Sequence, residues 1–311
     1  MSVLLPAREQ LQIFQITWLV QIRKLQRMKL IRFRCNGKVN PGVAIEHQYY
    51  DASTFGEDYN EGFFDSDGLV RLKNFLNEKG KMLPQLPDDI ELSSPVARPS
   101  KIVCIGLNYI DHAKEAKLSL PAEPIIFLKS TTALCGPNDT VIIPKGSVKT
   151  DWEVELAVVI SKKASYIDES EALNYVAGYS LMNDVSERSF QFDRSGTWDK
   201  GKGCDTFGPM GPFLATPDEI VNVNQMRLWL KINDKIMQDG NTADLIFKIP
   251  RLISYVSQFM TLLPGDVIST GTPAGVGMGM QPQVFLKDGD IMEMGSDCLG
   301  ICRQTVKMLA L

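Results

Sequence analysis

Histidine is scarce in this sequence, which has 311 residues but only two histidines, His47 and His112. That scarcity excludes a site built from three histidines, and the H-E-x-x-H pattern of zinc proteases is absent. The six cysteines are scattered without a C-x-x-C pair, and no histidine lies near Cys298 and Cys302, which are four positions apart. We therefore predict reduced thiols in a reducing compartment, and no zinc site.

Long hydrophobic runs and an excess of basic residues are also missing. No stretch of 18 uncharged apolar residues occurs, and the closest candidate, residues 11–22, is short and interrupted by three glutamines. We therefore predict no membrane span. The formal net charge of −4 weighs against a nucleic-acid partner. With 44% hydrophobic and 23% charged residues, the composition is that of an ordinary globular protein.

Composition divides the chain into three parts. Residues 1–27 are basic and poor in acid, and we interpret them as an extension upstream of the folded core, with an organellar targeting peptide as the alternative. No secretory cleavage site of the A-x-A kind follows, so we expect a cytoplasmic protein. The proline-rich, polar stretch 82–100 resembles a linker. It predicts a small N-terminal domain over 28–95 and a larger domain over 96–311.

Periodicity predicts many strands with a few helices between them. Asn36-Gly37 is a hairpin turn signal, Pro250 opens a helix, and Asp168 with Glu171 forms a capping box for a helix that ends at Gly178. Another helix is expected over 69–76, and strands are expected over 101–106, 124–129, 151–160, 179–185 and 228–234. Because the strands dominate and show no regular βαβ rhythm, we predict a mixed α+β fold rather than a doubly wound sheet.

A pair of acids stands on one of the expected strands. Glu153 and Glu155 are two positions apart, so their side chains share a face, opposite the apolar Trp152 and Leu156. Two acids on one face cannot both be buried and ionised without compensation, so either that face is solvated or a cation neutralises it. With Asp184 as a third carboxylate, the site would be all-oxygen and would suit Mg²⁺, Mn²⁺ or Ca²⁺ rather than Zn²⁺.

His112 is the candidate catalytic base. Glu115 lies three positions further on, and in a short helix the two side chains would be neighbours. A carboxylate beside an imidazole orients the ring and raises its basicity. The alternative is a surface turn in which the pair occurs by chance.

The segment after Asp184 carries Arg188, Gln191 and Lys202, which could bind the carboxylate and keto oxygens of an anionic substrate. The alternative is a solvated loop. Further on, the run GTPAGVG over 271–277 has no G-K-[ST] ending and contains a proline, so we reject a phosphate-binding loop. A tight loop that brings the backbone and Thr272 close to a ligand is still compatible with it.

Together these residues resemble the fumarylacetoacetate hydrolase family, across about 28–311 and most clearly over 101–280. The segments that carry the resemblance are GLNYIDHAKEA, PIIFLKSTTAL, DWEVELAVVI, YSLMNDVSER, WDKGKGCDTFGPMGP and VISTGTPAGVG. The N-terminal MKLIRFRCNGKVNPGVA is similar to the sugar-acid branch of the family, which includes 2,4-diketo-3-deoxy-fuconate hydrolases. One departure is Gly203, which replaces the serine that often follows the family lysine.

The resemblance implies a catalytic domain of the mixed β-sandwich-roll type, and usually a homodimer. It implies Mg²⁺ or Mn²⁺ held by Glu153, Glu155 and Asp184, with Ca²⁺ as a further occupant in a crystal. The remaining site residues implied by the resemblance are catalytic His112, Glu115 and Lys202, and substrate-binding Arg188, Gln191, Thr272 and Lys129.

The implied activity is metal-dependent hydrolysis of a C–C bond in a 2,4-diketo acid, either an acylpyruvate or a 2,4-diketo-3-deoxy sugar acid. Water would be activated by His112 and Glu115. The alternatives are decarboxylation of oxaloacetate, another metal-enolate lyase or isomerase reaction (including a ureidoglycolate lyase), and a family member that binds metal without turnover. The expected partner is a small keto acid, with neither nucleic acid nor membrane.

Overall fold

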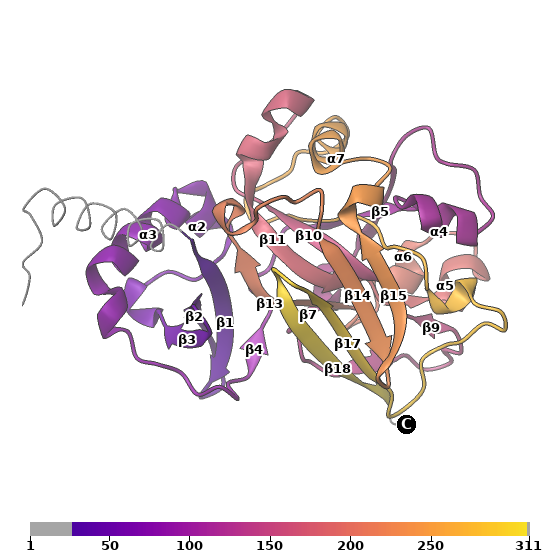
Figure 1. Cartoon of the computed structure of the whole chain (residues 1–311), viewed down its shortest axis with the longest axis horizontal. Coiled ribbons are helices and arrows are strands. Elements are labelled where there is room, and N and C mark those ends of the chain that lie inside the picture. The colour runs from indigo at the N-terminus through magenta and orange to yellow at the C-terminus, as the bar shows by residue number, and fades with distance from the viewer. Residues whose placement is uncertain (1–26, 310–311) are drawn as a thin grey trace, which may run out of the picture.

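The computed structural model describes residues 27–309 and has the mixed α+β architecture predicted from the sequence (Figure 1). Its largest sheet has 11 strands. Nine of them lie in the order β3 (Gln48–Asp51), β2 (Lys38–Ile45), β1 (Lys29–Cys35), β13 (Gly208–Ala215), β11 (Val176–Asn183), β10 (Val154–Ile160), β16 (Val267–Ser269), β5 (Ile102–Gly106) and β6 (Ile125–Lys129). The short strands β4 (Leu92–Ser93) and β7 (Leu134–Cys135) pair with β1 and β13.

A second sheet packs against the first. Its five strands lie in the order β15 (Lys235–Asn241), β14 (Arg227–Ile232), β17 (Ile291–Ser296), β18 (Gly300–Met308) and β8 (Val141–Ile143). A two-stranded ladder joins β9 (Thr150–Asp151) to β12 (Ser186–Glu187). The helices are α2 (Glu61–Asp65), α3 (Gly68–Lys79), α4 (Ile110–Glu115), α5 (Arg188–Phe192), α6 (Asp199–Lys202) and α7 (Ile249–Val256). Within residues 27–309, no helix is long and apolar enough to cross a bilayer.

Strand β10 lies at the centre of this packing and is buried on both faces. Val154, Leu156 and Val158 belong to the same hydrophobic core as Leu230 of β14 and Met294 of β17. On the other face, Ala157 and Val159 belong to a second core, shared with residues of β5 and β11. Because side chains alternate along a strand, the face that carries Ala157 also carries Glu155 near its start.

The N-terminal elements continue the large sheet. Strand β1 pairs with β13, with Leu30 opposite Leu214, and the β1–β2 hairpin turns at Asn36 and Gly37, both with positive φ. Helix α3 and helix α7, which has a proline in its first turn, occur where the sequence predicts them. The division into domains at 95/96 stays a prediction. Residues 1–26, which make up nearly all of the predicted extension, lie outside the described residues.

The helix predicted from the capping box is shorter than expected and of another type. A 3₁₀ helix runs over Glu169–Tyr175, and Asp168 makes no side-chain cap hydrogen bond. Gly178 does not end a helix, because it lies inside β11. A Cβ atom at Gly178 would stand 2.4 Å from the carbonyl oxygen of Ala215, so this glycine permits the close approach of β13.

Candidate metal centre and active site

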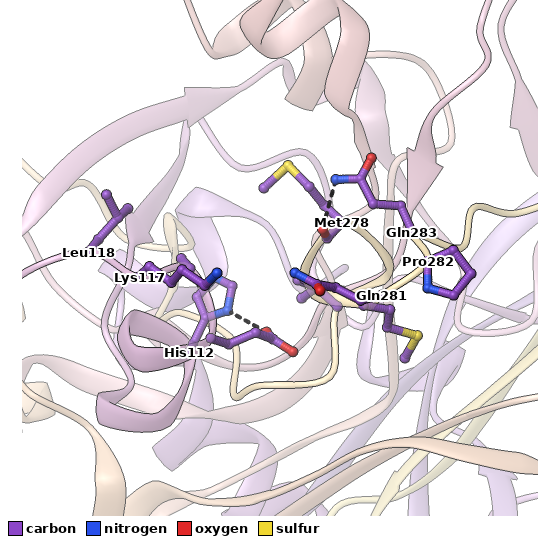
Figure 2. Close-up of a pocket in the computed structure, with 12 residues that line it drawn as sticks. His112, Lys117, Leu118, Met278, Gln281, Pro282 and Gln283 are labelled. Carbon is purple, nitrogen blue, oxygen red and sulfur yellow. Dashed lines mark hydrogen bonds and ion pairs between the residues drawn. The ribbon is translucent and has the colours of Figure 1, made fainter.

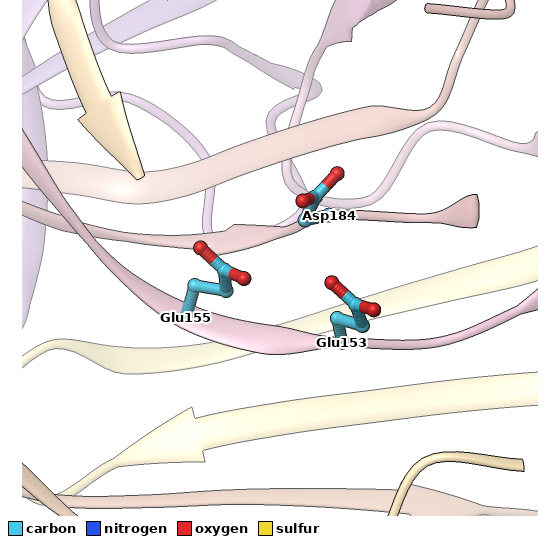
Figure 3. A group of neighbouring side chains, drawn as sticks. All are labelled: Glu153, Glu155 and Asp184. Atoms are coloured by element: carbon cyan, nitrogen blue, oxygen red, sulfur yellow. The ribbon is translucent and has the colours of Figure 1, made fainter. Parts of the chain in front are cut away.

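Three buried carboxylates meet where β10 and β11 pair. Val154 lies opposite Asn183, which places Glu153 beside Asp184, and the Asp184 amide donates to the Glu153 carbonyl at 2.9 Å. Figure 3 shows Glu153 and Glu155 pointing from one strand towards Asp184. One carboxylate oxygen from each of the three lies within 4.8 Å of those of the other two. The structure therefore brings together the residues that the sequence analysis proposed as metal ligands.

Three cationic side chains surround this cluster. Lys202 Nζ lies 2.7 Å from Glu153 Oε2 and 2.9 Å from Asp184 Oδ2, and Arg188 Nη2 lies 2.6 Å from Glu153 Oε1. Lys129 Nζ, fully buried, contacts Asp184 Oδ1 and donates to the carbonyl of Val185 at 3.0 Å. Each of these cations therefore pairs with Glu153 or with Asp184.

Glu155 has no such cation beside it among residues 27–309. Its Oε2 accepts hydrogen bonds from Ser269 Oγ at 2.6 Å and from the Gly271 amide at 2.9 Å. Burial raises its pKa well above the ordinary value, and the carboxylates of Asp184 and Glu153 raise it further. Burial would also raise the pKa of Glu153, but Lys202 and Arg188 outweigh that effect and lower it to about 2.

The donor set fits a hard divalent cation. All three potential ligands are carboxylates, which suits Mg²⁺ or Mn²⁺. Together with a fourth buried acid, Asp151, the site holds four carboxylates against the three cations Lys129, Arg188 and Lys202. Positive charge beside Glu155 would offset the burial and the repulsion that together raise its pKa.

We expect the metal-free protein to lose stability as the pH rises above 4.5, the ordinary glutamate pKa. Since Glu155 holds its proton longer in the folded state, unfolding becomes easier by about 1.4 kcal/mol per pH unit until the raised pKa is reached. Glu153, with its pKa near 2, contributes stability that is complete above 4.5 and adds no slope there. Thermal unfolding in EDTA between about pH 5 and pH 8 measures this slope. Glu155→Gln should lack this dependence of stability on pH. Equal slopes in the wild type and in Glu155→Gln would contradict the claim that Glu155 causes it.

The glycine-rich run 271–277 contacts acids of the site through its backbone. The Gly271 amide donates to Glu155, the Gly275 amide to Glu115 Oε1 at 3.0 Å, and the Gly277 amide to Asp151 Oδ1 at 2.7 Å. Gly275 has φ +104°, and a Cβ atom there would stand 1.9 Å from the carbonyl oxygen of Met237. The run is thus a tight loop whose amides order carboxylates, in agreement with the rejection of a phosphate loop.

Asp151 is a site residue that the sequence analysis missed. Its Oδ2 accepts from Arg188 Nε at 2.9 Å and from the Met278 amide at 3.0 Å, while Oδ1 accepts from the Gly277 amide. This buried carboxylate therefore fixes both Arg188 and the loop after Gly277. The sequence pattern could have revealed Asp151, because Asp151, Glu153 and Glu155 form one i, i+2 series.

We expect Asp151→Asn to lower stability by about 3–5 kcal/mol, because an amide would place N–H donors against Arg188 and a backbone amide in a buried position. Substrate KM should rise more than kcat falls, because Arg188 would lose its orientation while the other acids stay in place. Denaturant unfolding and steady-state kinetics measure the two effects. A variant with native stability and native KM would contradict the positioning role.

His112 and Glu115 lie on α4 and face a surface pocket of about 610 Å³ (Figure 2). His112 Nδ1 is 3.3 Å from Glu115 Oε2, and the other oxygen of Glu115 accepts the Gly275 amide. When Nδ1 carries the ring proton and donates a hydrogen bond to Glu115, Nε2 carries no proton and can accept one. The pair therefore has the arrangement of an oriented general base.

His112 also lines an inner cavity of about 160 Å³ that reaches the acidic cluster. Of the residues predicted to act in the site, this cavity is lined by His112, Glu153, Glu155, Arg188, Gln191, Lys202 and Thr272. Lys129 is not part of this lining, and its amine is occupied by Asp184 and Val185. The Thr272 hydroxyl donates to the Val154 carbonyl at 2.9 Å and accepts from Gln238 at 2.8 Å. The individual roles of these residues stay predictions.

Helices α5 and α6 place the polar groups of the cavity. Arg188 Nη1 donates to Gln191 Oε1 at 3.2 Å, so α5 holds both side chains together. Gly201 lets α6 pack closely on α5, because a Cβ atom there would stand 2.5 Å from the carbonyl oxygen of Glu187. That contact directs Lys202 into the acidic cluster.

This site, with buried carboxylates on paired strands and a histidine–glutamate helix beside them, is that of an enzyme with an acidic centre that could hold a metal ion. Residues 101–307 match the family model described as fumarylacetoacetate (FAA) hydrolase C-terminal. A Burkholderia lata protein is 47% identical over 275 residues, which are 88% of this chain and 96% of the relative. Its name suggests a hydrolase and gives no substrate. The chain therefore belongs to the fumarylacetoacetate hydrolase family.

Solved structures share the fold. A maleylpyruvate hydrolase from Sphingobium sp. SYK-6, in complex with manganese(II) and pyruvate, is 29% identical with a TM-score of 0.76, over 91% of this chain and all of that one. A 2-hydroxyhepta-2,4-diene-1,7-dioate isomerase from Mycobacterium marinum is 28% identical with a TM-score of 0.71, over the same shares. Hydrolase and isomerase names thus both occur on this fold.

Proposed function

We propose that this protein is a divalent-metal-dependent hydrolase that cleaves a C–C bond in a 2,4-diketo acid. The observation that carries the proposal is the shared cavity, in which His112 lies on the wall of a chamber that also contains Glu153 and Glu155. Glu153, Glu155 and Asp184 would hold Mg²⁺ or Mn²⁺. When bound, the ion supplies Lewis acidity for the 1-carboxylate and 2-keto oxygens of the substrate.

His112 acts as the general base. Its Nε2 takes a proton from water while Glu115 holds Nδ1 and stabilises the imidazolium. The hydroxide adds to the C4 carbonyl carbon, the C3–C4 bond breaks, and its electron pair forms the enolate of pyruvate. The C4 side leaves as a carboxylic acid, and the proton held by His112 returns to C3 to give pyruvate.

Arg188 and Gln191 orient the substrate, and Lys202 stabilises negative charge on the keto-acid portion. All three side chains are buried and line the cavity, so they act in a medium where charge interactions are strong. The charges of Arg188 and Lys202 are already balanced by Asp151, Glu153 and Asp184, and Gln191 accepts a hydrogen bond from Arg188, so all three are held in place before substrate arrives.

Isomerisation is the second candidate, favoured by the name of the Mycobacterium marinum neighbour. It would need proton transfer between substrate carbons and no attacking water. An oriented base beside an open pocket suits the activation of water, and this arrangement favours hydrolysis over isomerisation. Decarboxylation of oxaloacetate is the third, and it differs by the release of CO₂.

The ultraviolet enol absorbance of acylpyruvates and of a 2,4-diketo-3-deoxy sugar acid tests the proposal. Loss of absorbance with Mg²⁺ or Mn²⁺, abolished by EDTA and accompanied by pyruvate, is expected. If neither class is consumed, or if consumption yields no pyruvate, the proposal is wrong.

A further inference from the structure

We propose that the site selects substrates with an apolar tail, because the cavity beside the acidic cluster ends in an aromatic and aliphatic wall. This inference rests on the proposed function and names the substrate class. The wall consists of Ile105, Leu118, Ile125, Phe127, Phe192 and Trp198, which line the same cavity as Glu153 and Glu155. The tail would be the alkyl or aryl carbons attached to C4 of the diketo acid.

Trp198 organises this wall. Its ring packs edge-on against Phe127, with centroids 5.3 Å apart, and against Phe192 at 6.0 Å. It also lies on the backbone of Gly106, where a Cβ atom would stand 2.6 Å from the indole ring. Three aromatic rings held by one another present a rigid apolar surface, which binds hydrocarbon at little entropic cost.

The wall begins next to the polar end of the cavity. Lys202 Nζ lies 5.0 Å from the centroid of the Phe127 ring, while the same amine contacts Glu153 and Asp184. A keto acid held at the cluster would therefore have its carbon chain directed along Phe127. At this distance the acidic cluster and the apolar wall adjoin directly.

No spare cation meets the far end of such a chain among the described residues that line this cavity. Its lysine and arginine side chains are Lys202 and Arg188, and both are paired with acids of the cluster. A second carboxylate on the substrate would lie against aromatic rings without a cation partner, which disfavours its binding. Hydroxyl groups of a sugar-acid tail would likewise find no hydroxyl, amide or charged side chain among the six residues of the wall.

The outer pocket offers the competing arrangement. It shares His112, Leu118 and Met278 with the inner cavity and adds the polar Lys117 and Gln281. A dicarboxylic substrate would reach Lys117 by placing its tail in this outer pocket. We place the tail in the inner cavity because its wall adjoins the acidic cluster directly.

Binding of simple 2-oxo acids to the Mn²⁺-loaded protein tests the inference without requiring cleavage. By isothermal titration we expect Kd to fall about two- to fourfold per methylene from pyruvate to 2-oxohexanoate. The matched pair 2-oxohexanoate and 2-oxoadipate differs only by a terminal carboxylate, and 2-oxohexanoate should bind at least about tenfold more tightly. Equal affinity, or tighter binding of 2-oxoadipate, would overturn the proposal.

Two variants locate the effect. Phe192→Ser should flatten the dependence on chain length, measured as the ratio of the Kd of pyruvate to the Kd of 2-oxohexanoate, and Lys117→Ala should leave that ratio unchanged. Loss of 2-oxoadipate binding in Lys117→Ala would instead place the tail in the outer pocket and overturn the proposal. Chain-length dependence without cleavage of any diketo acid would support this inference and refute the proposed function. Cleavage that favours dicarboxylic diketo acids would support the proposed function and refute this inference.

Discussion

Glu155→Gln is expected to weaken Mn²⁺ binding on the order of 100-fold or more and to lower kcat by about 10³-fold. The metal-free variant should nevertheless be at least as stable as the wild type at neutral pH. The reason is that Glu155 is buried beside two other carboxylates and has no cation partner of its own among residues 27–309. A glutamine oxygen can still accept from Ser269 and Gly271, so the local hydrogen bonds persist.

Glu187→Gln is the matched control, because Glu187 is also buried but lies outside the cluster. Its carboxylate accepts hydrogen bonds from Ser147, Thr150 and Ser189, which lower its pKa although burial alone would raise it. The same substitution should therefore reduce stability here and leave Mn²⁺ affinity within about threefold. Isothermal titration and metal-free thermal unfolding measure both properties. Native Mn²⁺ affinity in Glu155→Gln would contradict the ligand assignment.

His112→Ala is expected to lower kcat by about 10²–10⁴-fold while leaving Mn²⁺ affinity unchanged. His112 lies on α4, and its contact within the site is Glu115 rather than an acid of the cluster. Glu115→Gln should have a smaller effect of about 10–100-fold, since the ring is still present but the neutral amide cannot stabilise the imidazolium, and its single oxygen can accept from His112 or from the Gly275 amide but not from both.

His47→Ala is the natural control for His112→Ala, because it removes the other histidine of the chain, which is exposed. It should leave kcat and metal affinity at the wild-type values. Steady-state rates at saturating Mn²⁺ compare the variants. A His112→Ala enzyme with native kcat would show that another group activates water.

The acidic cluster could be predicted because it depends on local rules. Side chains alternate along a strand, so Glu153 and Glu155 had to share a face, and the apolar residues after them indicated a buried strand. Asp184 could be added because it follows the next strand. The hairpin at Asn36 and Gly37 followed from equally local turn chemistry.

The partners of the cluster could not be predicted, because they come from distant parts of the chain. Asp151 is bound by Gly277 and Met278, and Glu155 by Ser269 and Gly271, contacts that no local pattern encodes. The same limit explains the error at Gly178. In the sequence it follows a helical pattern and suggests a helix end, whereas in the fold it makes room for β13.

The apolar wall of the cavity was equally hidden. Phe127 belongs to β6, Phe192 to α5, and Trp198 immediately precedes α6, so three unconnected elements supply the rings. In the sequence each of these aromatics would be assigned to a core. The role proposed for them in substrate selection rests on their contacts through Trp198 and on the position of Phe127 beside Lys202.

The most direct test of the central claim is the fate of solvent oxygen. An acylpyruvate is incubated briefly in ¹⁸O-labelled water with the Mn²⁺-loaded protein, and the products are analysed by mass spectrometry. The account predicts pyruvate and a carboxylic acid that has gained a solvent oxygen in its carboxylate, with none of this product in EDTA and at least about 100-fold less of it with His112→Ala. Turnover without solvent oxygen in the released acid, or with an intact carbon skeleton, would contradict water attack on the C4 carbonyl.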